Sequence, residues 1–426
     1  MEKTNEKQDF HRQNGWFGGT YMSCRVLFIS GSFGLGHVNR DLAIANEMRR
    51  ICPEIEIHWL AGSPASEVLE TAGEAFAPEQ AAYRGETELA DSTSHNGQLS
   101  LTAYVFRAMI SWMHNAHVSA IAASRDGYDV IVGDETYEIL IANLLGFYRL
   151  PPIPFIVLYD FLGMDVVSKN VFEKLGAWMI NLLWSNAWRV TTRGQNAAVF
   201  IGEREDVADR SFGWLLSNRR QNADKTIEFV GYAFPFDKKD IPPRDVLRRE
   251  LGYGKEPLVI CTVGGTSVGR DLLELCGQTF PLVAARVPGV HLILVAGPRI
   301  DPKSLAVPKE IDCRGMVPGL WRYLAACDLA VLQGGGMSTL EAEVLRVPFL
   351  FFPVENQAEQ QVTVANRLAR HKAGVRMSIA DTSPQQLANA IVANLGVQVT
   401  YPEIPADGTH LAARRILERA GISDLK

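Results

Sequence analysis

The strongest constraint on the fold is a regular alternation of short apolar runs with segments long enough to form helices. Several of these runs are continuously apolar, which is typical of strands buried on both faces of a parallel sheet. Strands and helices in this rhythm predict an α/β fold. The strands are expected at Arg25–Ser30, Glu56–Leu60, Asp129–Gly133, Pro154–Tyr159, Trp188–Thr192, Ile227–Val230, Leu258–Val263, His291–Ala296, Leu329–Gln333 and Phe349–Pro353.

A break in this pattern divides the chain of 426 residues into two halves. Residues Gly231–Arg244 contain three prolines and a charged end, so we expect a joint that contributes little to a core. Each half is long enough for a doubly wound, Rossmann-like domain. We therefore expect a loose extension at 1–21, domains at 22–230 and 231–405, and a terminal segment at 406–426 that is helical over His410–Ala420.

The composition limits the classes of function. The chain has 42 Lys and Arg against 48 Asp and Glu, and a net charge of −6 argues against sequence-independent nucleic-acid binding. Its six cysteines lack the spacing of zinc ligands, which indicates reduced thiols. The first 21 residues lack the apolar region of a signal peptide, and no 18-residue stretch is uninterruptedly apolar. We therefore expect a cytoplasmic protein.

The first expected strand leads through the glycine-rich loop GSFGLGH into a helix. Its GxxGxG spacing differs from the GxGxxG of dinucleotide-binding domains, so the sequence does not favour NAD. His37 stands where the loop becomes the helix, at the carboxyl end of a strand, where open α/β sheets bind ligands. There a neutral imidazole can take a proton from an acceptor hydroxyl. The alternative is that His37 only caps the helix or packs the loop.

Carboxylates at the ends of neighbouring strands are candidate partners for His37. Asp134 and Glu135 end one strand, and Asp160 ends the next. A carboxylate at this edge can orient a histidine ring and stabilise its protonated form, and we slightly favour Asp134 for this role. The alternative for Asp134 is that it caps the following helix.

The second half carries two further glycine-rich loops, each between a strand and a helix. The first contains Gly264, Gly265, Thr266 and Ser267, and the second runs from Gly334 to Thr339. Backbone amides, hydroxyls and helix dipoles from two such loops suit one shared diphosphate. Neither loop has the GK[ST] of a P-loop, which argues against that type of nucleotide hydrolysis.

Polar side chains near these loops are candidates for contacts with sugars. Glu341, in the first turn of the second helix, can accept two hydrogen bonds from ribose hydroxyls, or it can simply complement the helix dipole. Glu359, Gln360 and Gln361 offer the donors and acceptors that sugar hydroxyls need. Taken alone, the sequence of this loop is more typical of a solvated surface than of a sugar-binding site.

Together these residues resemble the GT-B glycosyltransferases. The pattern GG-x-ST-LEA-x(5)-P-x(4)-P-x(6)-QQ, here Gly335–Gln361, is shared with the branch that adds N-acetylglucosamine to peptidoglycan lipid I. A second likeness is to the UDP-sugar-dependent small-molecule glycosyltransferases. The GSFGLGHVNR and TVGGTS loops match their counterparts in that family, so the likeness spans most of the chain.

The resemblance implies two domains facing a cleft, with the acceptor bound by the N-terminal domain and a nucleotide-sugar by the C-terminal domain. It implies an inverting transfer of a hexose or N-acetylhexosamine, most readily from UDP and next from dTDP, to a hydroxyl. His37 would be the base and Asp134 its partner. The acceptor loop would include Gly34, Gly36 and Arg40.

The resemblance also assigns the donor-binding residues. The diphosphate would be held by Gly265, Thr266, Ser267 and the segment Gly335, Gly336, Met337, Ser338 and Thr339. Glu341 would hold the ribose, and Glu359, Gln360 and Gln361 would hold the sugar. The backbone of Val317, before a helix at Leu320–Ala326, would read the base, and the C-terminal helix would cross back to the first domain.

Two departures qualify the likeness. Gln333 stands where small-molecule glycosyltransferases often have a histidine, which weakens any claim for a cationic diphosphate ligand. The chain has no DxD triplet, so neither a metal ion nor another cofactor is expected. Positive helix ends can carry the charge of the leaving diphosphate instead.

The acceptor is expected to be a small molecule, a glycan or a lipid-linked molecule. Residues Leu99–Met113 and Val171–Trp188 are rich in large apolar side chains. For the second stretch, which has helical spacing, we favour burial in the core over an apolar acceptor pocket or a peripheral membrane contact. Two rival functions stay open: a non-hydrolysing nucleotide-sugar epimerase of the same fold, and a catalytically silent nucleotide-sugar-binding subunit.

Overall fold

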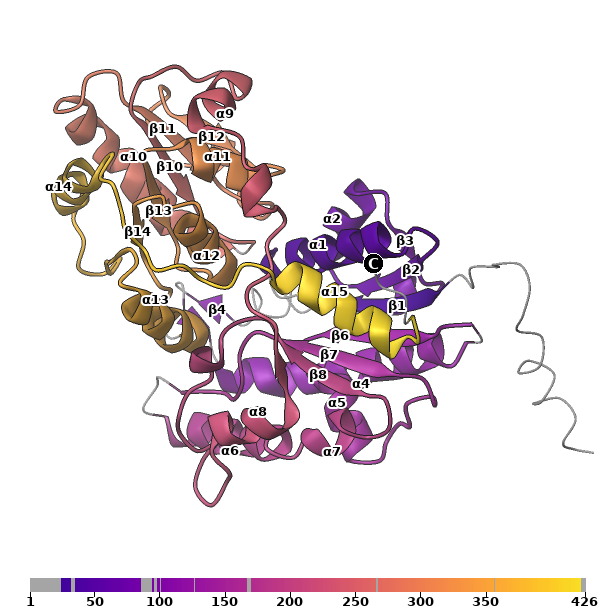
Figure 1. Cartoon of the computed structure of the whole chain (residues 1–426). Helices are drawn as coiled ribbons and strands as arrows, with labels where there is room; N and C mark the ends of the chain where they lie inside the picture. The colour runs from indigo at the N-terminus through magenta and orange to yellow at the C-terminus, as the bar shows by residue number, and fades with distance from the viewer. Residues whose placement is uncertain are drawn as a thin grey trace, which may run out of the picture.

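The computed structural model describes residues 24–31, 35–85, 94–95, 98–99, 101–125, 127–166, 170–265, 267–355 and 357–422, with only the backbone of 101–110. These residues form two α/β lobes, each built on one parallel sheet (Figure 1). The predicted fold class, two doubly wound domains, is therefore confirmed.

The N-terminal lobe is built on a seven-stranded sheet in the order β3-β2-β1-β6-β7-β8-β9, with every neighbouring pair parallel. Val26 and Phe28 of β1 face one core, whereas Leu27 and Ile29 face the other. Both faces are thus buried, which is why the strand is apolar throughout. The strands are β1 Arg25–Ser30, β2 Glu56–Ala61, β3 Ala75–Phe76, β6 Val130–Asp134, β7 Phe155–Tyr159, β8 Ala197–Phe200 and β9 Glu228–Phe229.

Helices cover both faces of this sheet. One face packs against α1, α2 and α15, and the other against α4 to α8. A separate hairpin of β4 Ser94–His95 and β5 Gln98–Leu99 precedes α4. The helices are α1 Gly36–Ile51, α2 Ala65–Thr71, α4 Leu101–Ala123, α5 Tyr137–Leu144, α6 Val171–Trp184, α7 Trp188–Thr191, α8 Arg219–Thr226 and α15 Gly408–Arg419.

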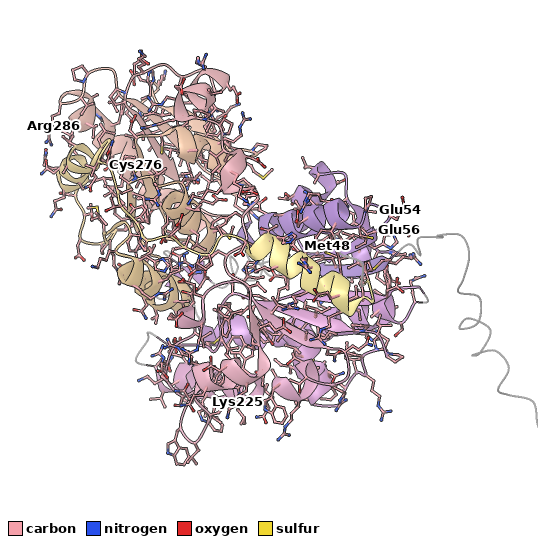
Figure 2. All side chains as sticks on the ribbon, viewed as in Figure 1. Met48, Glu54, Glu56, Lys225, Cys276 and Arg286 are labelled. Atoms are coloured by element: carbon pink, nitrogen blue, oxygen red, sulfur yellow. The ribbon has the colours of Figure 1, made fainter. Side chains whose placement is uncertain are left out.

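The C-terminal lobe repeats this architecture with a six-stranded parallel sheet in the order β12-β11-β10-β13-β14-β15. One face packs against α10 and α14, where Cys276 lies buried (Figure 2), and the other against α9, α11, α12 and α13. The elements are α9 Arg244–Glu250, β10 Leu258–Thr262, α10 Arg270–Ala284, β11 His291–Val295, β12 Asp312–Arg314, α11 Leu320–Ala326, β13 Leu329–Leu332, α12 Gly336–Val344, β14 Phe349–Phe351, α13 Ala365–His371, β15 Val375–Arg376 and α14 Pro384–Asn394.

Helix α15 lies on the N-terminal lobe, far in sequence from the elements that it contacts. Its apolar side packs beside α1, where Met48 is fully buried (Figure 2). His410 Nδ1 lies 2.5 Å from Glu47 Oε1, and Arg415 Nε lies 2.9 Å from Glu228 Oε2. The last helix therefore ties the end of the chain to the lobe in which the chain begins.

Two local predictions are wrong. The expected strand Trp188–Thr192 is helix α7, and the strand that fills this place in the sheet is β8, built from the small residues of Ala197–Phe200. The joint after Gly231 was expected to contribute little to a core, yet Tyr232 and Phe234 are buried in a small apolar cluster with Leu340 and Ile404. The first error arises because strand and helix runs this short look alike. The second arises because the prolines and charges of the joint outweighed its aromatic residues in the prediction.

Replacing Ile416, which is fully buried in α15, tests whether this helix stabilises the N-terminal lobe. We expect Ile416→Ala to lower the free energy of unfolding by about 2–5 kcal/mol, because it removes buried methyl groups and leaves a cavity. Urea unfolding followed by circular dichroism measures the change. Arg414→Ala, on the half-exposed side of the same helix, is the matched control and should change stability by less than about 0.5 kcal/mol. Equal losses in the two variants would contradict the packing of α15.

Candidate active site

His37 lies in the first turn of α1, directly after the loop that leaves β1. Its Nδ1 atom lies 2.8 Å from Asp134 Oδ2, at the carboxyl end of the neighbouring strand β6. Asp134 is almost fully buried. The loop passes so close that a Cβ on Gly31 would lie 3.0 Å from the same carboxylate oxygen. Of the candidate carboxylates, Asp134 therefore makes the shortest contact with the histidine.

Arg40, one helical turn after His37, joins the strand ends into one network. Its guanidinium is buried and pairs with Asp134 on one side, while Nη1 lies 2.7 Å from Asp160 Oδ2 on the other. Asp160 follows β7, the next strand in the sheet. Although burial favours its neutral form, Arg40 and His37 hold the pKa of Asp160 below its usual range. Arg40, expected in the acceptor loop, thus supports the histidine site from behind.

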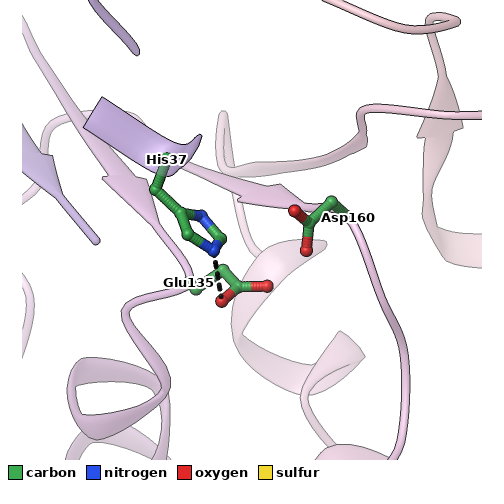
Figure 3. A group of neighbouring side chains, drawn as sticks. All are labelled: His37, Glu135 and Asp160. Atoms are coloured by element: carbon green, nitrogen blue, oxygen red, sulfur yellow. Dashed lines mark ion pairs between the residues drawn. The ribbon is translucent and has the colours of Figure 1, made fainter. Parts of the chain in front are cut away.

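Glu135 lies on the other side of the histidine ring (Figure 3). Its Oε2 atom is 3.6 Å from His37 Nε2. Its backbone φ of +52° is in the left-handed region, which is uncommon for a residue other than glycine and which turns the side chain toward the histidine. Burial, with the nearby charge of Asp160, raises the pKa of Glu135 well above its usual value. These surroundings therefore favour the protonated form of the Glu135 carboxyl, which can donate as well as accept.

His37, Glu135 and Asp160 also form the group in the described part of the chain whose atoms are placed to hold a metal ion, all within 4.8 Å of one another (Figure 3). Arg40 already neutralises Asp160 and contributes a fixed positive charge beside the group. A divalent cation would meet that charge at close range, so the arrangement suits proton exchange better than metal binding.

The electrostatic surroundings set the protonation of His37. Burial is the largest single effect and lowers the pKa of the imidazole. The charges of Asp134 and Asp160 together outweigh it, so that the pKa is raised to about 9. Without substrates the ring is thus protonated at neutral pH, with Nδ1–H donating to Asp134. Nε2 is the atom left to exchange a proton with a group bound in the cleft.

The cleft before His37 has a volume of about 530 Å³, and both lobes line it. Its walls include His37 and Asp160 from one lobe and the glycine-rich loops of the other. Gly36 lies so close to the opposite lobe that a Cβ there would come within 3.1 Å of Met337 Cγ. Of the residues predicted from the sequence, the lining contains Gly36, His37, Gly265, Val317, Gly335, Gly336, Met337, Ser338, Glu341, Glu359 and Gln360.

The N-terminus of α12 opens into this cleft. The loop before it turns at Gly334, whose φ of +87° is accessible to glycine without strain, and its backbone passes against Pro353. Gln333 Oε1 accepts a hydrogen bond of 3.2 Å from the Gly264 amide and so ties the two glycine-rich loops together. The first amides of a helix have no acceptor within it, so those of Gly336–Ser338 are available to an anion.

Glu341 lines the cleft one turn into α12 and is nearly buried. Burial alone raises the pKa of its carboxyl to about 8. Val317 lines the far side of the cleft, before α11, whose N-terminus is set by Gly319 with φ of +63°. The two residues predicted to hold a ribose and a base therefore lie in one cavity with the glycine-rich loops.

The glutamines after β14 have different surroundings. Glu359 and Gln360 begin a π-helical turn, Glu359–Val364, and line the cleft; such turns are frequent at functional sites. Burial, followed by the charge of Asp160, raises the pKa of Glu359. Gln361 is not part of the lining: its Nε2 donates to the carbonyls of Pro353 and Val354, and its Oε1 accepts from Arg376.

Thr339 is likewise not part of the lining. It is fully buried, and its hydroxyl donates to the carbonyl oxygens of Gly335 and Gly336. Gly34 and Thr266, expected in the acceptor and diphosphate loops, lie outside the described residues, as does the side chain of Ser267.

One structural residue of the site carried no signal in the sequence. Arg367, buried in α13, donates through Nη2 to the Gly336 carbonyl and the Thr339 hydroxyl, at 3.0 Å each. It thereby fixes the first turn of α12 and adds a positive charge behind it. Its segment, ANRLARH, reads as an ordinary surface helix, and only the tertiary structure reveals that this arginine is buried.

Among the described helices, none is long and apolar enough to cross a membrane.

Comparison with known proteins finds relatives of this chain. No family model matches the chain. It is 28% identical over 369 residues to an uncharacterised glycosyltransferase of Methanosarcina acetivorans, covering 86% of this chain and 88% of that protein. It is 25% identical over 264 residues to an NDP-glycosyltransferase of Bacillus subtilis, covering 56% of this chain and 64% of that protein.

A third relative is the UDP-N-acetylglucosamine–N-acetylmuramyl-(pentapeptide) pyrophosphoryl-undecaprenol N-acetylglucosamine transferase of Carboxydothermus hydrogenoformans. It is 25% identical over 154 residues, which are 35% of this chain and 41% of that protein. The match to an uncharacterised glycosyltransferase of Methanopyrus kandleri covers 47% of that protein. These two alignments and the Bacillus alignment thus span less than two thirds of the relatives.

Among solved structures, the glycosyltransferase of kitacinnamycin aligns with a TM-score of 0.57 at 16% identity, covering 94% of this chain and 97% of that one. The calicheamicin glycosyltransferase CalG4 aligns with a TM-score of 0.56, covering 93% and 95%. These likenesses show the fold. Together with the relatives above, they establish that the chain is a glycosyltransferase of the GT-B fold, related both to the peptidoglycan N-acetylglucosamine transferases and to the NDP-glycosyltransferases.

Proposed function

We propose that this glycosyltransferase moves a hexose or N-acetylhexosamine from a nucleoside diphosphate sugar to an acceptor hydroxyl, with inversion and without a metal ion. One observation carries the proposal: His37, paired with Asp134, lines the same cleft as the free amides of α12. The base and the anion site therefore face one another across a space that fits a sugar.

His37 removes the proton from the acceptor hydroxyl as that oxygen attacks the anomeric carbon. The bond from this carbon to the diphosphate oxygen breaks with its electron pair, and the diphosphate leaves. Amides of Gly336–Ser338, aided by the dipole of α12, stabilise the charge that develops on the leaving oxygen. Asp134 holds the ring and stabilises the imidazolium that forms.

The donor is proposed to be a UDP-sugar, with a dTDP-sugar as the next candidate. Glu341 favours this order, because its carboxylate can accept from both ribose hydroxyls of UDP, whereas dTDP offers only one. The related transferase from Carboxydothermus is itself named for UDP-N-acetylglucosamine. Val317 is proposed to meet the base, and Glu359 with Gln360 the sugar.

The donor assignment is tested by thermal-shift measurements with UDP, dTDP, GDP, ADP and their sugars, in magnesium and in EDTA. We expect stabilisation by one nucleotide family, of about 2.7 kcal/mol at a ligand concentration 100 times Kd, and equal in both buffers. A shift that requires magnesium would contradict the metal-independent site, and no shift with any nucleotide would contradict the donor site.

The role of His37 is tested by His37→Gln. We expect turnover to fall by about 10²–10⁴-fold with little change in donor affinity, because the base is lost while the diphosphate site stays intact. His410→Gln, a partly exposed histidine on α15, is the control and should keep full turnover. Unchanged turnover of His37→Gln would contradict its role as the base. Donor binding without turnover in the wild type would indicate a silent binding subunit, and acceptor-independent conversion of the donor to its epimer would indicate an epimerase.

The pH dependence follows from the pKa of His37, which is about 9. A base must be neutral, so kcat/KM should rise about tenfold per pH unit below this value and level off above it. Asp134→Asn removes the charge that raises this pKa most. The kcat/KM of this variant should therefore begin to rise at lower pH and level off at a lower value. Initial rates between pH 6 and 10 measure both, and a flat wild-type profile would contradict the assignment.

Glu341 gives a signature of ribose binding that does not depend on turnover. With a pKa of about 8, its carboxyl is mostly protonated at pH 7, whereas ribose hydroxyls that donate to it favour the ionised form. UDP binding should therefore release up to about one proton, which calorimetry in Tris and in phosphate buffers detects. Glu341→Gln should abolish the release. Equal observed binding enthalpies of the wild type in the two buffers, which mean that no proton is released, would contradict this contact.

A further inference from the structure

The side chains of His37, Glu135 and Asp160 converge at the carboxyl ends of β1, β6 and β7 (Figure 3). One ring nitrogen or carboxylate oxygen of each residue lies within 4.8 Å of the corresponding atoms of the other two. The proposed reaction uses only one of these atoms, Nε2 of His37. Because the charge of Arg40 beside the group argues against a metal ion, the two carboxyl groups still need a task.

Asp160 is the carboxylate of this group that faces the cleft. Its side chain is 29% exposed, and Asp160 lines the cleft together with His37. Arg40 Nη1 lies 2.7 Å from Asp160 Oδ2, and this ion pair favours the ionised carboxylate. An ionised carboxylate has about four acceptor positions and no donor. Asp160 therefore has the capacity to accept a hydrogen bond from a molecule bound in the cleft.

Glu135 is placed to separate His37 from Asp160. Its Oε2 atom lies 3.6 Å from His37 Nε2, and its carboxyl is hydrogen-bonded to Asp160. On the other side, the Tyr137 hydroxyl donates to Glu135 Oε1 at 3.1 Å. Glu135 is not part of the cleft lining. Its contacts therefore fix the spacing between the histidine and Asp160.

The segment that follows Asp160 is attached firmly to α6. Phe161 packs edge-on against Trp184, with ring centroids 5.6 Å apart. The Asn181 amide pairs with the backbone of Met164 in both directions, at 2.7 and 2.9 Å. Asp160 is therefore held between its ion pair with the arginine and a packed segment, which favours a selective contact because little reorganisation is needed.

This attachment uses only one face of α6. The other face carries exposed apolar side chains, with exposed fractions of 74% for Phe172, 56% for Leu175 and 57% for Met179. The preference for burial of Val171–Trp188 in the core is therefore wrong for that face. The contribution of α6 to the site is made through its buried face.

Hydroxyl groups on adjacent carbon atoms fit the distance between His37 and Asp160. Two such oxygens lie about 2.8 Å apart, which is close to the length of one hydrogen bond. Two hydrogen bonds of this length that diverge slightly reach a histidine nitrogen and a carboxylate oxygen up to 4.8 Å apart. A single hydroxyl can reach the histidine but leaves Asp160 without a partner from the acceptor.

We propose that the acceptor is a vicinal diol, and that Asp160 selects it by binding the hydroxyl next to the one that reacts. The reacting hydroxyl gives its proton to His37 Nε2, whereas the neighbouring hydroxyl keeps its proton and donates a hydrogen bond to Asp160. This inference rests on the proposed role of His37 as the base. A hydrogen bond to a buried charge discriminates strongly, because an acceptor that lacks the second hydroxyl leaves the carboxylate desolvated and unpaired.

The test compares two isomers that carry the same number of hydroxyls. In trans-cyclohexane-1,2-diol the hydroxyls are adjacent, whereas in trans-cyclohexane-1,4-diol the two C–O bonds point in opposite directions across the ring. With the sugar nucleotide that the thermal-shift measurements select, we expect kcat/KM to be about 10–100-fold higher for the 1,2-isomer. Equal values for the two isomers would overturn the inference.

Substitutions of Asp160 test which residue causes the preference. Asp160→Ala should lower the ratio of the two kcat/KM values to about one. Asp160→Asn can still accept from Arg40 but offers a neutral amide to the cleft, so it should give an intermediate ratio. The ratio is measured within one protein and does not depend on the fraction that is folded. A wild-type ratio in Asp160→Ala would overturn the inference.

Asp165→Asn is the matched control. Asp165 lies on the same segment and pairs with the buried Arg219 at 2.8 Å, but it is not part of the cleft lining. This variant should keep the wild-type ratio, even if it is less stable. Loss of the preference in both the Asp160 and the Asp165 variants would assign the effect to the packing of the segment and would overturn the contact with the acceptor.

A binding measurement distinguishes failure of this inference from failure of the proposed function. Saturation-transfer NMR with UDP present measures the affinity of both isomers without turnover. Transfer to neither isomer, together with tighter binding of the 1,2-isomer that Asp160→Ala abolishes, would contradict the proposed transfer but support the diol site. Equal binding of the two isomers, or no binding of either, would overturn the diol site.

Discussion

The ion pairs of the buried Arg40 in α1 are the interactions on which the cleft-facing edge of the N-terminal sheet depends. Arg40 joins Asp134 at the end of β6 to Asp160 at the end of β7, and its own helix begins at the end of β1. The carboxyl ends of β1, β6 and β7 are thereby held together. Removing one partner of such a buried pair typically costs about 3–5 kcal/mol, because a charge is left without compensation. The same charges set the pKa of His37, so the stability and the chemistry of this edge are linked.

The C-terminal lobe presents the N-terminus of α12 to the cleft, where we propose that an anion binds. The first turn of α12 is fixed from behind by Arg367, and the preceding loop is fixed by Gln333. Its amides therefore point at the cleft in a rigid arrangement, and rigid dipoles stabilise a developing charge without reorganisation. Close approach of Gly36 to Met337 brings this turn opposite the histidine.

Much of this arrangement could be predicted from the sequence. Continuous apolar runs followed by glycine-rich turns identified β1, β10 and β13 and the helices after them, because strands buried on both faces leave a strong local signal. Short or weakly apolar elements were missed or misassigned. The sequence at Ala197–Phe200 is too short and too poor in large residues to read as a strand, whereas Trp188–Thr191 is apolar enough to resemble one.

Sequence by itself determined the parallel α/β class and the residue types at the ends of the strands, because periodicity and glycine spacing are local properties of the chain. It left open whether Asp134 or Asp160 meets His37 and whether α6 is covered, and it assigned both Gln360 and Gln361 to the sugar site. Only the tertiary structure decided these points: Asp134 touches the histidine, Gln360 lines the cleft, and one face of α6 is exposed. Each depends on the distance between segments far apart in the chain, and a local pattern does not encode that distance.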